Sequence, residues 1–161
     1  MKVLFLDLDG VANSEQQVRQ QERLGTFNEA EAMLRVDVCS IAISNLAYIL
    51  DCVPDLKIVV HSSRRKRFTL EEIAGFVKLP IDRFFGITDP KIQDRSESIM
   101  TWVKKHEKEL THFLILDDSP IFGFESKNLI NTDPSHGLLL REAKDAVDRL
   151  GGKNDEKVYN F

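Results

Sequence analysis

Apolar residues gather in three short runs, which predict three buried strands. The runs lie within Lys2 to Leu8, Leu56 to His61 and His112 to Asp117, and each is almost unbroken by polar residues. Such runs are typical of parallel strands that are covered on both faces, because neither face then needs polar side chains. Residues 128 to 131 form a shorter apolar segment that we interpret as a fourth strand.

Helical spacing separates these runs. Ile43, Leu46, Ala47, Leu50 and Val53 recur at intervals of three and four residues, which predicts a helix that Pro54 ends. Further helices are predicted from Thr69, from about Ser96, and from Leu140 to Leu150. Thr69 and Glu72 have the spacing of a capping box. Residues 13 to 32 are polar and show no clear period.

Strands that alternate with helices predict one α/β domain, a three-layer Rossmann-like sandwich around a central parallel sheet with right-handed crossovers. We assign this domain to residues 1–150 and a charged tail to residues 151–161. Residues 13–35 have room for a small flap but not for a folded cap domain, so the expected cap is minimal or absent.

Composition narrows the class of protein. The chain has 161 residues, of which 42% are hydrophobic and 30% charged, as in an ordinary globular protein. No apolar run approaches the roughly 20 residues of a membrane span, so we expect no membrane association. Cys39 and Cys52 lie too far apart on one predicted helix to pair, which favours free thiols in the cytoplasm. Oligomeric state does not follow from these data.

Carboxylates follow two of the three predicted strands. Asp7 and Asp9 end the first strand, and Asp117 and Asp118 end the third. Open α/β sheets bind their ligands at the carboxyl ends of strands, so these acids are expected in one crevice. Gly10 allows the chain to turn away sharply after Asp9, because it has no Cβ.

Several acids in one crevice repel one another unless a cation neutralises them. Mg²⁺ suits such a site, since it binds carboxylates, water and substrate phosphate. A lone Asp-x-Asp-Gly segment is more often a turn or a helix cap. A calcium-binding EF-hand loop does not fit, because Val11 and Val18 stand where that loop needs oxygen ligands.

The middle strand ends in Ser62-Ser63-Arg64. Hydroxyl and backbone N–H groups at a strand end can bind phosphoryl oxygens, and neighbouring arginines add positive charge. The four consecutive cations Arg64 to Arg67 are either a solvated surface or a phosphate-binding rim. His61 alternates with Ser62, so we expect it to point away from the site as a core or supporting histidine.

These motifs together resemble the haloacid dehalogenase superfamily, whose members are mostly phosphatases. Asp7-Leu8-Asp9-Gly10-Val11 resembles the first motif of that superfamily, Ser62 the second and Asp117-Asp118 the fourth, in the family order. The resemblance covers roughly residues 1 to 150.

Within the superfamily, the chain most resembles the small phosphatase-like domains of bacterial RNA-repair proteins. The segments that carry this closer resemblance are Ser62-Ser63-Arg64, Arg95 ahead of Ile99 and Trp102, Ile115 to Asp118, and Thr132 to Leu138. For the third motif, a cation, spacing in the subfamily favours Arg95 and the commoner residue type favours Lys91. We retain both and favour Arg95.

The resemblance implies a mechanism and a role for each residue. Asp7 is expected to attack phosphorus and form an aspartyl-phosphate, and Asp9 to act as general acid and then base. The resemblance implies Mg²⁺ ligands from Asp7, the backbone carbonyl of Asp9, and Asp117. Asp118 is implied to bind the ion through water or to support the other ligands. The residues implied to hold the phosphoryl group are Ser62, Arg95 or Lys91, and, on the substrate side, Gly10, Ser63 and Arg64.

Other functions fit parts of this pattern. A regulatory phosphoacceptor or phosphate-binding module also gathers acids, a hydroxyl and a cation at strand ends, but its phosphorylated Asp follows a middle strand, where this chain has Ser62. For a phosphatase, the expected substrate is a terminal phosphate on a nucleic acid or nucleotide, because Arg64 to Arg67 would line an uncapped site. A small phosphometabolite or a phosphoprotein is the alternative substrate.

Overall fold

Strands and helices alternate along the chain in the computed structural model, which describes residues 1–25 and 38–153. The strands are β1 (Lys2–Leu6), β2 (Leu56–Val60), β3 (Phe84–Ile87), β4 (His112–Asp117) and β5 (Leu129–Asn131). The helices are α1 (Glu15–Arg23), α3 (Ser40–Cys52), α4 (Leu70–Val77), α5 (Arg95–Lys105) and α6 (Leu140–Arg149). A short 3-10 turn, η1 (Ser63–Lys66), follows β2.

The strands form one parallel sheet in the order β3-β2-β1-β4-β5. In β1, Leu6 is in register with Val60 of β2 on one side and Leu116 of β4 on the other. The three strands therefore end side by side, and the residues that follow them emerge at the same edge of the sheet. The predicted α/β Rossmann-like sandwich is confirmed.

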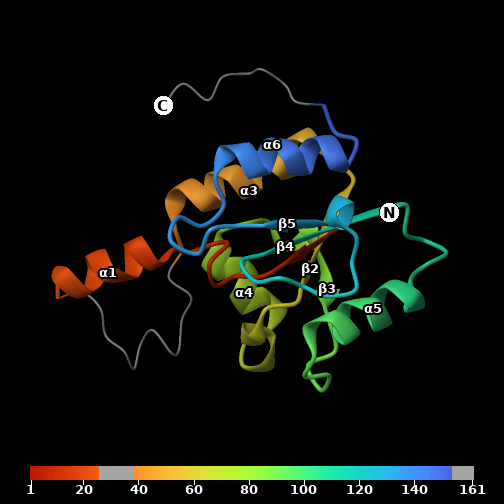
Figure 1. Cartoon of the computed structure of the whole chain (residues 1–161), viewed down its shortest axis with the longest axis horizontal. Coiled ribbons are helices and arrows are strands. Elements are labelled where there is room, and N and C mark those ends of the chain that lie inside the picture. The colour runs from red at the N-terminus through yellow and green to blue at the C-terminus, as the bar shows by residue number, and fades with distance from the viewer. Residues whose placement is uncertain (26–37, 154–161) are drawn as a thin grey trace.

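Alternate residues of β1 supply two cores, because successive side chains point to opposite faces of a strand. Leu4 and Leu6 pack with buried residues of α3, α4 and α6, while Val3 and Phe5 pack with Ile99 and Trp102 of α5. Figure 1 shows α3 and α6 side by side on one side of the sheet and α5 on the other. Burial on both faces explains the uninterrupted apolar runs.

Local sequence signals set several helix ends. Thr69 and Glu72 form the predicted capping box of α4, with both reciprocal hydrogen bonds present. Asp94 caps α5 by accepting a 2.7 Å bond from the Glu97 backbone N–H, which fixes the first turn of the helix that begins with Arg95. No helix within residues 1–25 and 38–153 is long and apolar enough to cross a membrane.

Two elements differ from the sequence prediction. β3 was not predicted, because it is a four-residue edge strand that contains Gly86 and the 45% exposed Phe85. The polar stretch after residue 13, for which no helix was predicted, contains α1, none of whose residues is buried. An exposed helix needs no apolar stripe, which explains the missing period. The rest of the predicted flap at 13–35 lies outside the described residues from position 26 onward.

Candidate active site

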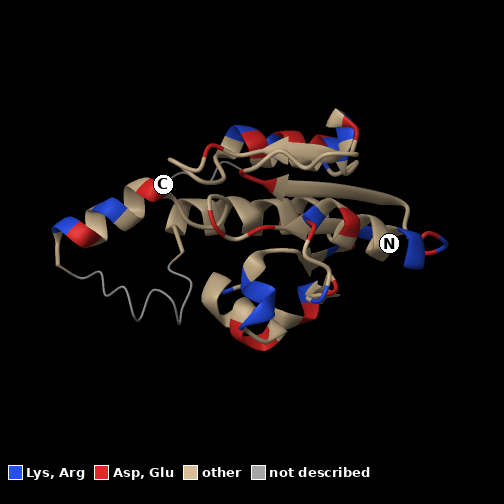
Figure 2. Ribbon diagram, turned by 60° about the horizontal axis from the view of Figure 1, so that its bottom comes forward, with Lys and Arg blue, Asp and Glu red and all other residues tan. Residues whose placement is uncertain are grey.

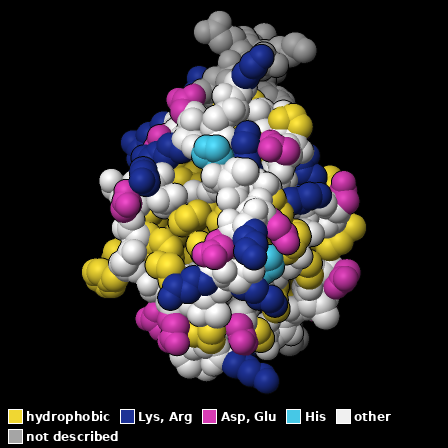
Figure 3. Space-filling view, turned by 90° about the vertical axis from the view of Figure 1, so that its right-hand side faces the viewer, with side chains coloured by type: hydrophobic (Ala, Val, Ile, Leu, Met, Phe, Trp, Pro, Cys, Tyr) yellow, Lys and Arg dark blue, Asp and Glu magenta, His cyan; other side chains and the backbone are white. Residues whose placement is uncertain are grey.

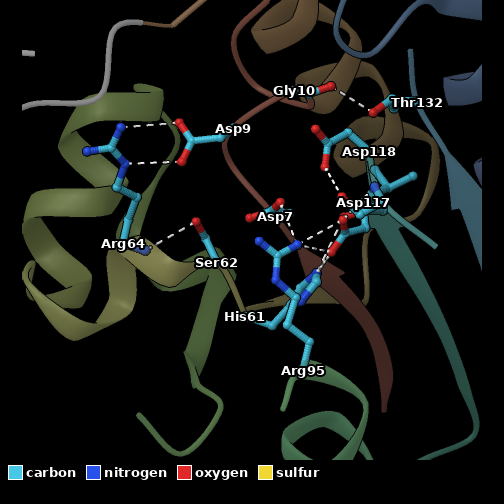
Figure 4. Close-up of polar contacts among 12 residues, drawn as sticks. Asp7, Asp9, Gly10, His61, Ser62, Arg64, Arg95, Asp117, Asp118 and Thr132 are labelled. Carbon is cyan, nitrogen blue, oxygen red and sulfur yellow. Dashed lines mark hydrogen bonds and ion pairs between the residues drawn. The ribbon is translucent and has the colours of Figure 1, made fainter. Parts of the chain in front are cut away.

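The carboxyl ends of β1, β2 and β4 bring the predicted motifs together (Figure 4). Asp7 directly follows β1, Asp117 ends β4, and Ser62 lies two residues beyond β2. The Asp7 backbone N–H donates a 3.0 Å bond to Leu116 O, which keeps the two acids at the same level of the sheet. The side chains of Asp7, Ser62 and Asp117 are all buried.

A cluster of three carboxylates forms at this edge. Asp7, Asp117 and Asp118 each offer an oxygen atom, and these atoms all lie within 4.8 Å of one another in the described part of the chain. Asp7 Oδ1 is buried and has no hydrogen-bond partner there, which is costly unless the atom has another ligand. A hard divalent cation with oxygen ligands fits this donor set.

Gly10 is required by the close approach of two loops. Its φ is +75°, and a Cβ at this position would lie 2.7 Å from Asp118 Cβ. The Gly10 carbonyl accepts a 2.7 Å bond from the buried Thr132 hydroxyl. Only glycine therefore permits Asp118 to lie against the first motif.

Arg95 supplies the cation of the cluster. Its Nη1 donates to Asp7 Oδ2 at 3.1 Å and to both Asp117 oxygens at 2.9 and 2.8 Å. Lys91 is exposed, and the described residues give its ammonium group no ion pair. The structure brings Arg95 and not Lys91 to the carboxylates.

Burial and charge shift the pKa values of these groups. Burial raises the pKa of Asp7 despite the nearby Arg95. Burial, reinforced by the charge of Asp7, raises the pKa of Asp117 to about 7. Burial disfavours the charged form of Arg95, but Asp7 and Asp117 outweigh it and raise the pKa of the guanidinium. When both buried acids are ionised, they carry more negative charge than one arginine neutralises, which favours a divalent cation.

We expect the Asp117→Asn variant to gain stability relative to the wild type as pH rises, when no divalent metal is present. Folded Asp117 keeps its proton up to about pH 7, whereas the unfolded chain releases it near pH 4. The stability that the protonated Asp117 contributes to the wild type is therefore complete below about pH 4 and is lost as pH rises towards 7. The amide of the Asp117→Asn variant does not titrate, so the variant has no such loss.

Urea unfolding of both proteins in EDTA between about pH 5 and pH 8 measures this difference. The difference in unfolding free energy should grow in favour of the variant by an amount on the order of a few kcal/mol. Adding Mg²⁺ at the upper pH should stabilise the wild type and not the variant. A difference in unfolding free energy that does not change with pH would contradict a buried Asp117 carboxyl with a raised pKa.

The residues after β2 have divided roles. Ser62 accepts a bond from the Arg64 backbone N–H at 3.3 Å, which begins η1, and Ser63 is exposed. Arg65 is 4% exposed and donates to the His61 and Ser62 carbonyls at 2.8 and 2.9 Å. The expectation that all four cations line the rim is therefore wrong for Arg65, because its guanidinium satisfies carbonyl groups inside the turn.

His61 lies beneath the carboxylates. It is fully buried, and its Nε2 is 3.4 Å from Leu116 O and 3.6 Å from Asp117 Oδ2. Burial and the charge of Arg95 lower its pKa to about 3, so the imidazole is neutral. The prediction of a buried, supporting histidine agrees with this position, but the side chain does not point away from Asp117.

Asp9 is held at the outer edge of the site. Its carboxylate accepts bonds from Arg64 at 3.1 and 3.3 Å and from Asn13 Nδ2 at 3.1 Å (Figure 4 shows the Arg64 bonds). The Asp9 carboxylate is not in the carboxylate cluster. This agrees with the resemblance, which implies that Asp9 binds the metal through its backbone carbonyl. Asn13 was not singled out from the sequence, because nothing but its proximity to Asp9 marks it.

The surface has one hollow beside the site and a second near the opposite end of the sheet. A cleft of about 480 Å³ lies between the first motif and α1 and includes Asp9, Asn13 and Asp118. A cavity of about 620 Å³ lies near the start of β4, where Figure 3 shows apolar side chains among charged ones. The residues that line this second cavity do not include Arg95 or the three clustered carboxylates Asp7, Asp117 and Asp118.

The fold and the site define a haloacid dehalogenase-like domain, with acids and a hydroxyl at adjacent strand ends of a Rossmann-like sheet and a cation from the first turn of α5. A family model described as "HAD domain in Swiss Army Knife RNA repair proteins" matches residues 3–143, and the chain belongs to this family. No curated protein and no solved structure matches the chain. Both the superfamily and the subfamily resemblance seen in the motifs are confirmed. Domains of this superfamily are generally hydrolases, often phosphatases.

Proposed function

We propose that this protein is a Mg²⁺-dependent phosphomonoester hydrolase that acts through an aspartyl-phosphate on Asp7. The observation that carries the proposal is the cluster of Asp7, Asp117 and Asp118, in which the buried Asp7 and Asp117 both pair with Arg95. Phosphoryl transfer depends mainly on positioning and charge neutralisation, and this cluster is suited to both. The free thiols Cys39 and Cys52 are compatible with the cytoplasm, where we place this activity.

The chemistry has two displacements. An oxygen of Asp7 attacks phosphorus, and the bond from phosphorus to the ester oxygen breaks while Asp9 gives that oxygen a proton. Asp9 then takes a proton from water, which attacks the same phosphorus and displaces Asp7 as inorganic phosphate forms. Ser62 and Arg95 hold the phosphoryl oxygens. Bound Mg²⁺, with Asp7, Asp117 and Asp118 as protein ligands, supplies positive charge to the phosphoryl group.

We further propose a terminal phosphate on a nucleic acid as substrate. The family description concerns RNA repair. Lys66, the last residue of η1, and Arg67, which follows it, are exposed and offer positive charge close to Ser62 in the chain. Figure 2 shows charged residues mostly on helices and loops around a largely uncharged sheet. Between β1 and α3, the described residues form only the nine-residue α1, so no folded cap is seen in that part.

An exposed aromatic ring adds a second feature. Phe122 is 80% exposed, and its backbone carbonyl accepts a bond from the Ser96 hydroxyl, next to Arg95. Aromatic side chains stack on nucleobases and contribute about 1–3 kcal/mol per base. Phe122 is therefore a candidate contact for the terminal base.

A phosphate-release assay tests the function and the substrate together. We expect phosphate release from 3′- or 5′-phosphorylated oligonucleotides that requires Mg²⁺ and stops with EDTA. This release should be faster than from small esters, and its kcat/KM should fall at high salt. Lys66→Gln with Arg67→Gln should lower kcat/KM for the oligonucleotide but not for p-nitrophenyl phosphate. Lys104→Gln with Lys105→Gln is the charge-matched control, because these lysines lie in the last turn of α5.

Each contrary outcome has a distinct meaning. Fast turnover of small esters with little salt dependence would contradict the nucleic-acid substrate and leave a phosphatase. Phosphate binding without release from any ester would contradict the enzyme and favour a binding or phosphoacceptor module.

A further inference from the structure

The Asp9 carboxylate is held by two side chains of different kinds. Arg64 donates to both oxygens, with Nε 3.1 Å from Oδ2 and the second nitrogen 3.3 Å from Oδ1. Asn13 donates to Oδ1 alone, at 3.1 Å. The arginine is charged and able to bind a phosphate instead, whereas the amide is neutral.

The Asn13 side chain is itself fixed at both ends. Its Oδ1 accepts a 2.7 Å bond from the Gly10 backbone N–H, so its Nδ2 is the group that reaches Asp9. Its backbone N–H donates to Leu8 O at 3.3 Å. Gly137 lies so close that a Cβ there would be 2.7 Å from Asn13 O. The neighbouring loops thus leave Asn13 little freedom to move.

We propose that Asn13 is a positioning residue that orients Asp9 for proton transfer to the leaving group. This inference rests on the proposed function, in which Asp9 is the general acid. Asn13 engages Oδ1 and leaves Oδ2 bonded only to Arg64 among the described residues. A substrate phosphate that draws Arg64 away therefore exposes Oδ2, while Asn13 still holds the carboxylate in place.

A positioning role of this kind depends on the leaving group. Proton transfer from a general acid helps a poor leaving group, such as phenol or a sugar hydroxyl, much more than a good one, such as dinitrophenol. A change that misdirects Asp9 should therefore slow cleavage of the phenyl ester and spare cleavage of the dinitrophenyl ester, whereas the later hydrolysis of the aspartyl-phosphate, in which Asp9 is the base, slows equally for both. A change that merely loosens the site should slow both alike.

The test uses a series of aryl phosphates from dinitrophenyl to phenyl phosphate with the full chain and saturating Mg²⁺. We expect Asn13→Ala to lower kcat/KM, which reports only the steps through cleavage of the ester, by about 100-fold for phenyl phosphate and to leave kcat/KM for dinitrophenyl phosphate nearly unchanged. Asp9→Asn should show the same dependence on the leaving group. In the Asp9→Asn background, Asn13→Ala should have little further effect, because the two residues act as one unit.

Two further variants separate positioning from folding. Asn13→Asp keeps an oxygen for the Gly10 N–H but loses the donor to Asp9, so it should retain the leaving-group effect of Asn13→Ala. Ser14→Ala removes the hydroxyl that accepts from the Gln17 N–H and caps α1, so it should lower the melting temperature without a leaving-group effect.

An equal loss across the series in Asn13→Ala, or no loss at all, would overturn the role of Asn13 while leaving the phosphatase intact. A wild type that hydrolyses none of the esters would instead overturn the proposed function and this inference with it.

Discussion

The Asp7→Asn variant is expected to fold normally and to lose phosphatase activity, by about 10⁴-fold or more, as when other catalytic nucleophiles are removed. An amide oxygen is a poor nucleophile, and the amide cannot form the aspartyl-phosphate. Burial raises the pKa of Asp7, so ionised Asp7 is unfavourable in the fold without metal. The melting temperature of the variant in EDTA should therefore equal or exceed that of the wild type.

Phosphate release under saturating Mg²⁺, together with thermal unfolding in EDTA, measures both effects. Asp55→Asn makes the same chemical change at an exposed site, where Asp55 pairs with Lys2 at 3.4 Å, and should leave activity unchanged. An Asp7→Asn variant that keeps more than about a tenth of the activity would remove Asp7 from the role of nucleophile.

The Arg95→Ala variant is expected to lose about 100- to 1000-fold in kcat, the loss typical of removing a group that stabilises transition-state charge. Arg95 is the cation that contacts both Asp7 and Asp117, and without it the phosphoryl oxygens lose a donor in a largely buried site. The exposed Lys91 provides the matched control, and Lys91→Ala should change kcat by less than about threefold.

Both variants must be compared at saturating Mg²⁺, because Arg95→Ala also leaves Asp7 and Asp117 without their cation. In EDTA at high pH we expect a lower melting temperature for Arg95→Ala and no change for Lys91→Ala. If Lys91→Ala shows the greater loss of kcat, the third motif is at Lys91.

The central strands could be predicted from the sequence because burial on both faces leaves an unmistakable pattern. Val3 to Leu6 are all fully buried, and their strand pairs on both sides. At the margins of the fold this signal fails. Phe85 is exposed in the edge strand β3, and α1 buries no residue, so neither element shows a period.

The site could be predicted as far as strand ends determine it. Asp7, Ser62 and Asp117 meet because parallel strands end at a common edge. For the cation, the spacing in the subfamily favoured Arg95 over Lys91, and the structure has Arg95 beside the acids. Contacts that depend on loop shape could not be predicted. Arg65 looks like one of four solvated cations until the fold supplies carbonyl acceptors from His61, Ser62 and Ile92. The bond of Asn13 to Asp9 depends on the conformation of the loop after Gly10.

Chemical trapping of the aspartyl-phosphate tests the central proposal most directly. Wild-type protein is mixed with a turning-over phosphate ester and Mg²⁺, quenched, and reduced with borohydride, which converts an acyl phosphate of aspartate to homoserine. Peptide mass spectrometry then locates the modified residue. We expect reduction at Asp7 when both ester and Mg²⁺ are present, and none in EDTA or in Asp7→Asn. Steady turnover with an unmodified Asp7, or with reduction at another carboxylate, would contradict Asp7 as the nucleophile.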